Sequence, residues 1–301
     1  MGANCGIERV TMSERFQTVV ELMAALRAPD GCPWDRKQTH ESLKPYLLEE
    51  TYEVLEILDR QDRGKLAEEL GDVLLQVLFH SQIASEAGSF TIDDVLEQLA
   101  DKLIRRHPHV FKNGAADQVP MNADQVVMRW EDIKRTEREA SGQPASVLDG
   151  VPQTLPALLR AYQLQARAAR VGFDWTHDAK GFDQVLGKIE EEIRELRVAI
   201  RAPEPNQAEP DAATARQAQI VAEFGDVLFS LVNLSRFIKV NPEDALRQAA
   251  NRFVERFQFI EARATESGRS VGDLSFAEMD RLWTQAKEQN PAMGAEEGRH
   301  E

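Results

Sequence analysis

The chain has 301 residues, 42% of them hydrophobic, and a formal net charge of −15 at pH 7. This apolar content is enough for one large or two modest domains, and 17 glycines with 13 prolines exclude a collagen-like or globally disordered chain. The acidic balance argues against general binding to a nucleic-acid backbone, because like charges repel.

Cysteine content and hydropathy indicate the compartment. Two cysteines, Cys5 and Cys32, are too few for a disulfide framework. No uninterrupted apolar run reaches the roughly 18 residues of a membrane span, and the first residues lack the apolar core of a signal peptide. These features predict a soluble protein of the cytoplasm, with no membrane or nucleic-acid partner.

Helical periodicity dominates the chain, and strand patterns are nearly absent. One apolar helical stripe consists of Leu66, Leu70, Val73, Leu74, Val77 and Leu78. The sequence therefore predicts an all-α protein. In chain order, the predicted helices span residues 13–28, 42–62, 64–87, 92–107, 122–140, 154–170, 180–201, 215–239, 242–267 and 275–289.

The second half of the chain repeats the first. Gly31–Trp34 corresponds to Gly172–Trp175 at an offset of 141 residues, and further matches follow at offsets of 142, 154, 150 and 153. The jump from 142 to 154 indicates a 12-residue insertion in the second copy, at the proline-rich stretch 202–211. The repeat predicts two tandem domains, 13–140 and 154–289, with a linker at 141–153 and a flexible tail at 290–301.

Each copy carries four carboxylates whose neighbours at helical spacing are apolar. Glu50, for example, follows Leu47 by three residues and precedes Val54 by four, so the three share one helix face. A single such acidic pair is typical of a solvated face, but here two pairs recur in register. Like charges on an apolar face are costly unless a cation neutralises them, and the all-oxygen set favours Mg²⁺ or Mn²⁺. The predicted ligands are Glu50, Glu53, Glu69 and Asp72 in the first copy, and Glu192, Glu195, Glu223 and Asp226 in the second.

Basic residues and one tryptophan per copy suit phosphate oxygens and a stacked base. Taken one by one, these residues also fit solvated surface charge and a core tryptophan, so both interpretations stay open. The candidates are Lys188, Arg252, Arg256, Trp283 and Lys287 in the second copy, and Lys102, Arg106, Trp130 and Lys134 in the first.

The motifs as a set resemble the MazG family of nucleoside triphosphate pyrophosphohydrolases, in its tandem two-domain form. The similarity covers residues 13–289 and rests on Gly31–Asp35, on the paired acidic motifs and on the final Trp-x-x-x-Lys. It implies four-helix-bundle domains that dimerise, and Mg²⁺-dependent hydrolysis of nucleoside triphosphates to monophosphate and pyrophosphate, which removes unwanted nucleotides. The metal-ligand and nucleotide-contacting roles of the family fall on the carboxylates and cations named above.

The two copies differ around these motifs. Lys188 of the second copy corresponds to Tyr46 of the first, which makes the C-terminal site the stronger candidate for activity. Glu191, or Glu49 in the first copy, lies outside the ligand set and is a candidate general base for the attacking water.

Two other functions stay open at this point. A related all-α pyrophosphatase would act on a narrower substrate, such as dUTP or phosphoribosyl-ATP. A helical adaptor would bind nucleotide without hydrolysing it, although a purely structural role would not call for two acidic quartets.

Overall fold

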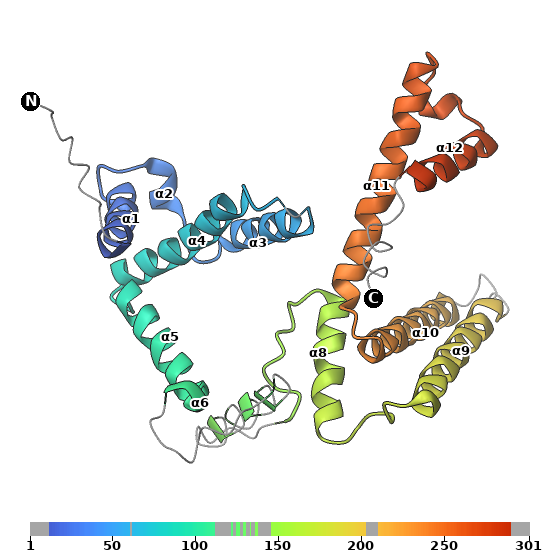
Figure 1. The fold of residues 1–301 in the computed structure, drawn as a ribbon, viewed down its shortest axis with the longest axis horizontal. Coiled ribbons are helices and arrows are strands. Elements are labelled where there is room, and N and C mark those ends of the chain that lie inside the picture. Colours follow the sequence, from blue (N-terminus) through green and yellow to red (C-terminus); the bar gives the residue numbers. More distant parts are fainter. Residues whose placement is uncertain are drawn as a thin grey trace, which may run out of the picture. The chain divides into compact units, whose positions relative to one another are not determined.

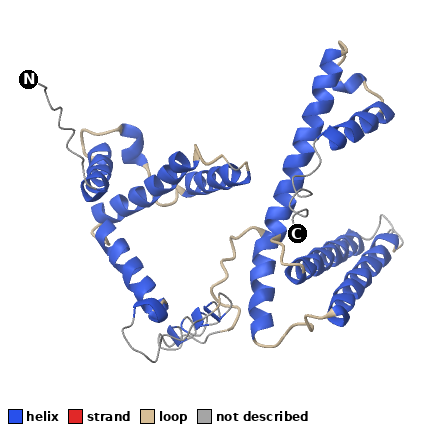
Figure 2. Ribbon diagram, in the orientation of Figure 1, coloured by secondary structure: helices blue, strands red, loops and turns tan. Residues whose placement is uncertain are grey.

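The computed structural model describes residues 12–60, 62–111, 146–202 and 210–289, together with 122, 125–126, 129–130, 133 and 136–137. All regular structure in these residues is helical, which confirms the predicted all-α class (Figure 2). The chain divides between Gln143 and Pro144 into two compact units.

The first unit is built around a pair of neighbouring helices, α3 (Lys44–Asp59) and α4 (Leu66–Glu86) (Figure 1). Helix α4 also contacts α1 (Met12–Arg27) and α5 (Ile92–Arg106), while the short helices α2 (Pro33–Lys37) and α6 (Pro108–Phe111) accompany α1 and α5. The buried core of this unit consists of Met23, Leu43, Leu78 and Phe79.

The second unit repeats the pair with longer helices, α9 (Ala179–Arg201) and α10 (Pro210–Phe237). Helix α8 (Ala157–Arg170) packs against α10 and against α11 (Pro242–Glu266), which in turn carries α12 (Phe276–Gln289) and the 3₁₀ turn η1 (Val271–Asp273). Figure 1 shows α12 lying along α11, whereas α10 lies beside α8 and α9 lies on the far side of α10. A small core at α11 and α12 contains Ile260, Ala264 and Leu274.

Local chemistry explains where several of these helices begin. The Asp178 carboxylate accepts the Gly181 N–H at 2.8 Å and caps α9, and Asn241 accepts the Glu243 N–H at 3.0 Å before α11. Helix α5 starts with a reciprocal capping box between Thr91 and Asp94.

The predicted helices agree with the observed ones to within a few residues. The largest difference is α10, which begins at Pro210 and not at residue 215, because the helix includes the end of the predicted insertion. The short helices α2, α6 and η1 were not predicted, since a single turn has no hydrophobic period. The predicted helix 122–140 lies largely outside the described residues.

The predicted domain limits, 13–140 and 154–289, stay a prediction. Residues 141–145 of the predicted linker and the whole tail 290–301 lie outside the described residues. The rest of the linker contacts α8, because Arg167 donates to the carbonyl oxygens of Asp149 and Gly150.

Helix α10 contains one stretch, Ala212–Phe237, that is long and apolar enough to cross a membrane by length and composition. Glu223 and Asp226 interrupt this stretch, which is why no uninterrupted apolar run is visible in the sequence. Helix α10 contacts α8 and α9 within the unit, and 22% of its most apolar window is buried.

Candidate active site

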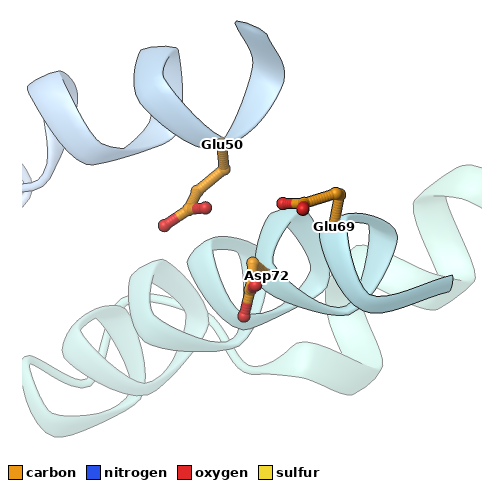
Figure 3. A group of neighbouring side chains, drawn as sticks. All are labelled: Glu50, Glu69 and Asp72. Carbon is orange, nitrogen blue, oxygen red and sulfur yellow. The ribbon is translucent and has the colours of Figure 1, made fainter. Parts of the chain in front are cut away.

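Three carboxylates of the first unit gather between α3 and α4. Glu50 on α3 points toward Glu69 and Asp72 on α4 (Figure 3). One oxygen from each lies within 4.8 Å of the others, and all three side chains are half-buried. Because Glu69 and Asp72 are three residues apart on one helix, the helical period places both on the same face.

The carboxylates of this first cluster repel one another. Loss of water raises the pKa of Glu50, and the nearby carboxylates of Asp72 and Glu53 raise it further. The pKa of Glu69 is raised for the same reasons, by partial burial and then by Glu53, Glu68 and Asp72. A site that disfavours its own ionised form is stabilised by a cation.

The second unit brings together the corresponding residues, Glu192 on α9 with Glu223 and Asp226 on α10. Glu192 is 6% exposed, Glu223 is half-buried and Asp226 is exposed. Lys188 reaches this second cluster: its Nζ lies 2.7 Å from Glu192 Oε1 and 3.0 Å from Glu191 Oε1. These two hydrogen bonds raise the pKa of the Lys188 ammonium above its usual value, so the group stays charged.

The structure corrects the expected environment of the carboxylates. Of the eight predicted ligands only Glu192 is buried, and the others are half-buried or exposed. The apolar neighbours in sequence therefore do not enclose the site, because each cluster lies on the open side of a two-helix pair. Glu53 lies beside the first cluster without belonging to its closest three residues, and Glu195 is exposed outside the second.

The donor chemistry of both clusters fits a hard divalent cation. Each offers at least three carboxylate oxygens close enough to share one ion, with no nitrogen or sulfur donor among them. The raised pKa values of Glu50 and Glu69 agree with this fit, because both groups lack a neutralising partner within the cluster.

A cavity of about 680 Å³ opens beside the second cluster. Lys188, Glu192 and Asp226 line one part of it, and the remainder is formed by α8, the loop 172–175 and the later turns of α10. Its lining on α10 runs from Asp226 to Arg236, a rise of about 15 Å along the helix. The lining includes Leu164, Gln165, Phe173, Asp174, Trp175, Val185, Phe229, Ser230 and Asn233.

The sequence prediction missed this cavity wall. Gln165 and Asn233 belong to no motif, and the repeat alone singles out Trp175. The difference between the two copies is a sequence signal for this cavity wall. At the offsets of 141 and 154 residues, Gln165 and Asn233 correspond to the apolar residues Ala24 and Phe79 of the first copy.

The predicted basic group of the second unit lies on α11 and α12. Arg256 stacks over Trp283 with its guanidinium carbon 5.6 Å from the ring centroid, and Phe253 packs on the same ring at 5.3 Å. Arg252 is half-buried on α11, and Lys287 is exposed on α12. Among the described residues, neither arginine forms an ion pair with the second cluster.

The basic group of the first unit is only partly described. Lys102 on α5 is exposed, while Arg106 pairs with Glu137 at 2.7 Å. The Trp130 ring lies 4.9 Å from that of His107. Lys134 lies outside the described residues.

The two candidate bases are placed differently. Glu191 accepts a hydrogen bond from Lys188, whereas Glu49 is exposed on α3. The described structure thus brings a lysine, a candidate base and a carboxylate cluster together in the second unit.

Comparison with known proteins shows the family of this chain. Residues 38–111 match the family model of the MazG nucleotide pyrophosphohydrolase domain. The chain is 46% identical over 272 residues to the nucleoside triphosphate pyrophosphohydrolase/pyrophosphatase MazG of Thermotoga maritima, covering 90% of this chain and 95% of that protein. It is 40% identical over 276 residues to the nucleoside triphosphate pyrophosphohydrolase of Escherichia coli K12, covering 91% and 98%. An uncharacterized protein of Bacillus subtilis, YabN, is 45% identical over 281 residues, with 93% of this chain matching 53% of that protein.

Proposed function

This chain belongs to the MazG family, and from that premise we propose that it hydrolyses nucleoside triphosphates, both ribo- and deoxyribonucleotides, to monophosphate and pyrophosphate. Such an activity removes unwanted nucleotides from the cytoplasmic pool. The observation that carries the proposal is the second cluster, where Glu192, Glu223 and Asp226 adjoin both Lys188 and a cavity large enough for a nucleoside.

We assign Mg²⁺, or Mn²⁺ in its place, to the carboxylates. When bound, the ion would offset the charge of the triphosphate oxygens and polarise a phosphoryl group. Glu192, Glu223 and Asp226 would hold it in the second unit with Glu195 nearby, and Glu50, Glu69 and Asp72 in the first unit with Glu53 nearby.

The chain's own residues supply the remaining steps. Glu191, which is held in place by its hydrogen bond from Lys188, accepts the proton of a water molecule as that water attacks phosphorus, and the bond between the α- and β-phosphoryl groups breaks. Lys188 binds the phosphate oxygens of the substrate and of the leaving pyrophosphate. Glu49 is the corresponding base in the first unit. The further proposed substrate contacts are Arg252, Arg256, Trp283 and Lys287, and in the first unit Lys102, Arg106, Trp130 and Lys134.

We propose that the working form is a homodimer. Leu96, Leu99 and Leu103 of α5 are each more than two-fifths exposed, and no residue of that helix is buried. Such an unpaired apolar stripe gains stability when a second copy covers it. Light scattering on the whole chain tests this state.

Substrate range and hydrolysis are tested together. Pyrophosphate release with Mg²⁺ is measured for the common ribo- and deoxyribonucleoside triphosphates, with dUTP and phosphoribosyl-ATP included. Turnover of several triphosphates supports the proposal, and turnover of dUTP or phosphoribosyl-ATP alone supports the narrower enzyme.

A variant links the activity to the second cluster. Glu192→Ala should abolish turnover while the helical content stays at the wild-type level. Near-normal hydrolysis in this variant would refute the site, and tight nucleotide binding by the wild type without hydrolysis would favour the adaptor.

A further inference from the structure

The cavity beside the second cluster contains polar groups that the proposed hydrolysis does not use. Gln165 on α8 is 6% exposed, and its Oε1 is buried without a hydrogen-bond donor among the described residues. The same holds for the buried Oδ1 of Asn233 on α10. A buried acceptor without a donor is costly, so a cavity lined by two of them is suited to a ligand that donates.

The orientation of the Gln165 amide is set by the backbone. Its Nε2 donates to the carbonyl oxygen of Phe229 at 2.8 Å, and a flipped amide would place two acceptors against each other. The Phe229 carbonyl is also the helical acceptor for the N–H of Asn233, four residues later. The Gln165 amide nitrogen therefore lies close to the backbone of Asn233, and both residues line the same cavity.

A donor stands on the same wall, one helical turn further along α10. Arg236 lines the cavity, and its Nη2 donates to Asp174 Oδ2 at 2.6 Å, which holds the guanidinium in place. Both side chains are largely buried, at 9% and 12% exposed. On this wall Arg236 is a charged donor, and the carbonyl oxygens of Gln165 and Asn233 are two buried acceptors without a donor, next to the Ser230 hydroxyl and the Asn233 amide nitrogen.

This polar pattern matches one nucleobase edge. Guanine carries an acceptor, O6, followed by two donors, N1–H and the N2 amino group. Adenine offers one donor and one acceptor, cytosine offers one donor with two acceptors, and uracil or thymine offers one donor between two acceptors. Among these Watson–Crick edges, guanine is the one whose two donors lie on separate atoms, so its edge can give Gln165 and Asn233 one donor each and give Arg236 an acceptor.

We propose that the cavity between α8, α9 and α10 is a nucleobase subsite in which Gln165 and Asn233 accept hydrogen bonds from a guanine base. This inference rests on the proposed function, because it gives the second cluster a preferred substrate, a guanosine triphosphate. Trp175 and Phe229 supply aromatic lining for the base. Asn233 lies seven residues beyond Asp226, a rise of about 10 Å along α10, which is comparable with the span from a β-phosphate to a base.

The wild-type chain tests the subsite directly. GTP is compared with ITP, which lacks only the N2 amino group, and with ATP, by pyrophosphate release with Mg²⁺. We expect kcat/KM for GTP to be on the order of 10-fold higher than kcat/KM for ITP. The difference between GTP and ATP should be larger, because each analogue leaves a buried acceptor unpaired. Calorimetric binding of GMP, IMP and AMP should follow the same order.

Variants of the acceptors assign the preference to this wall. Asn233→Leu and Gln165→Leu should reduce the ratio of kcat/KM for GTP to kcat/KM for ITP toward one. Asn233→Asp retains an acceptor and should keep more of this preference for GTP. Gln184→Leu is the matched control, because Gln184 is exposed on α9 outside the cavity lining. This variant should have the same ratio of kcat/KM for GTP to kcat/KM for ITP as the wild type.

The outcomes separate this inference from the function on which it rests. Equal kcat/KM for GTP, ITP and ATP, with equal binding of GMP and IMP, would overturn the guanine subsite and leave the hydrolase intact. Selective binding of GMP without release of pyrophosphate from any triphosphate would support the subsite and overturn the hydrolase. Persistence of the wild-type ratio in both leucine variants would also overturn the subsite.

Discussion

Phe79 of the first unit occupies the helix position that corresponds to Asn233 of the second unit, and Phe79 is 3% exposed. The ring centroids of Trp34 and Phe79 lie 6.4 Å apart, and those of Trp34 and Tyr46 lie 5.7 Å apart. Tyr46 is the counterpart of Lys188. Aromatic side chains thus pack together in the first unit where the second unit has polar groups around a cavity. The duplicated carboxylates place the same cation chemistry in both units, but the neighbouring wall differs, and that wall governs what else can bind.

The loop that follows the first helix of each unit is also held in two ways. In the first unit, Arg27 donates to the carbonyl oxygens of Asp35 and Gln38, at 2.5 and 3.3 Å, and its guanidinium pairs with Glu86 at 2.8 Å. In the second unit, the ion pair between Asp174 and Arg236 has this role.

The glycine that opens this loop in each unit shows the same divergence. A Cβ on Gly31 would meet the Leu26 carbonyl oxygen at 2.3 Å, whereas Gly172 adopts a φ of +88°. The motif is therefore retained for different local reasons in the two units.

The largest expected effect is the difference in kcat between variants of the two carboxylate clusters. Glu192→Gln should lower kcat by at least roughly 100-fold, because the variant removes a cation ligand beside Lys188 and the cavity. Glu50→Gln should remove only the smaller share of hydrolysis that the first unit contributes. Steady-state pyrophosphate release measures both, and equal losses would contradict the assignment of the main site to the second unit.

Removing the ion pair between Asp174 and Arg236, which holds the loop 172–175, should strongly destabilise the second unit. Asp174→Asn leaves Arg236 as a largely buried charge without its partner, which costs about 3–5 kcal/mol in comparable cases. Urea unfolding measures the change. As the control, Glu266→Gln removes the exposed pair with Arg263 and should cost less than about 1 kcal/mol. Similar values for the two variants would show that the ion pair between Asp174 and Arg236 is dispensable.

The lysine that distinguishes the units should act on substrate binding. Lys188→Met should raise KM for a triphosphate about 10-fold, because a charge-assisted hydrogen bond to phosphate is lost. Lys180→Met is the matched control, since Lys180 is exposed at the start of α9, away from the second cluster. An unchanged KM would mean that Lys188 serves only to neutralise Glu191 and Glu192.

The smallest effect concerns acid stability at the start of α12. Arg269 and then Ser275 lower the pKa of Glu278 from 4.5 to about 2. Because the folded pKa is depressed, the stabilisation is present above pH 4.5 and is lost as the pH falls toward about 2. The thermal midpoints of wild type and Glu278→Gln should differ at neutral pH and converge over this range, and a constant difference would contradict the ion pair.

Much of the fold followed from local patterns. The stripe from Leu66 to Leu78 predicted α4, and the recurrence of its Glu-x-x-Asp motif predicted α10, since a helical period repeats every 3.6 residues. The acidic ligands of both clusters were named because their spacing fits one face of a helix. The degree of enclosure could not be predicted, because the exposure of Glu53 or Asp226 depends on which helices cover it.

The sequence by itself determined the all-α class and the duplicated acidic motifs, because hydrophobic period and residue spacing act within a few turns of one helix. Only the tertiary structure decided that Gln165 and Asn233 face one cavity near Lys188. These residues lie on three helices and far apart in the chain, so their meeting depends on how α8, α9 and α10 pack, a property that no local spacing encodes.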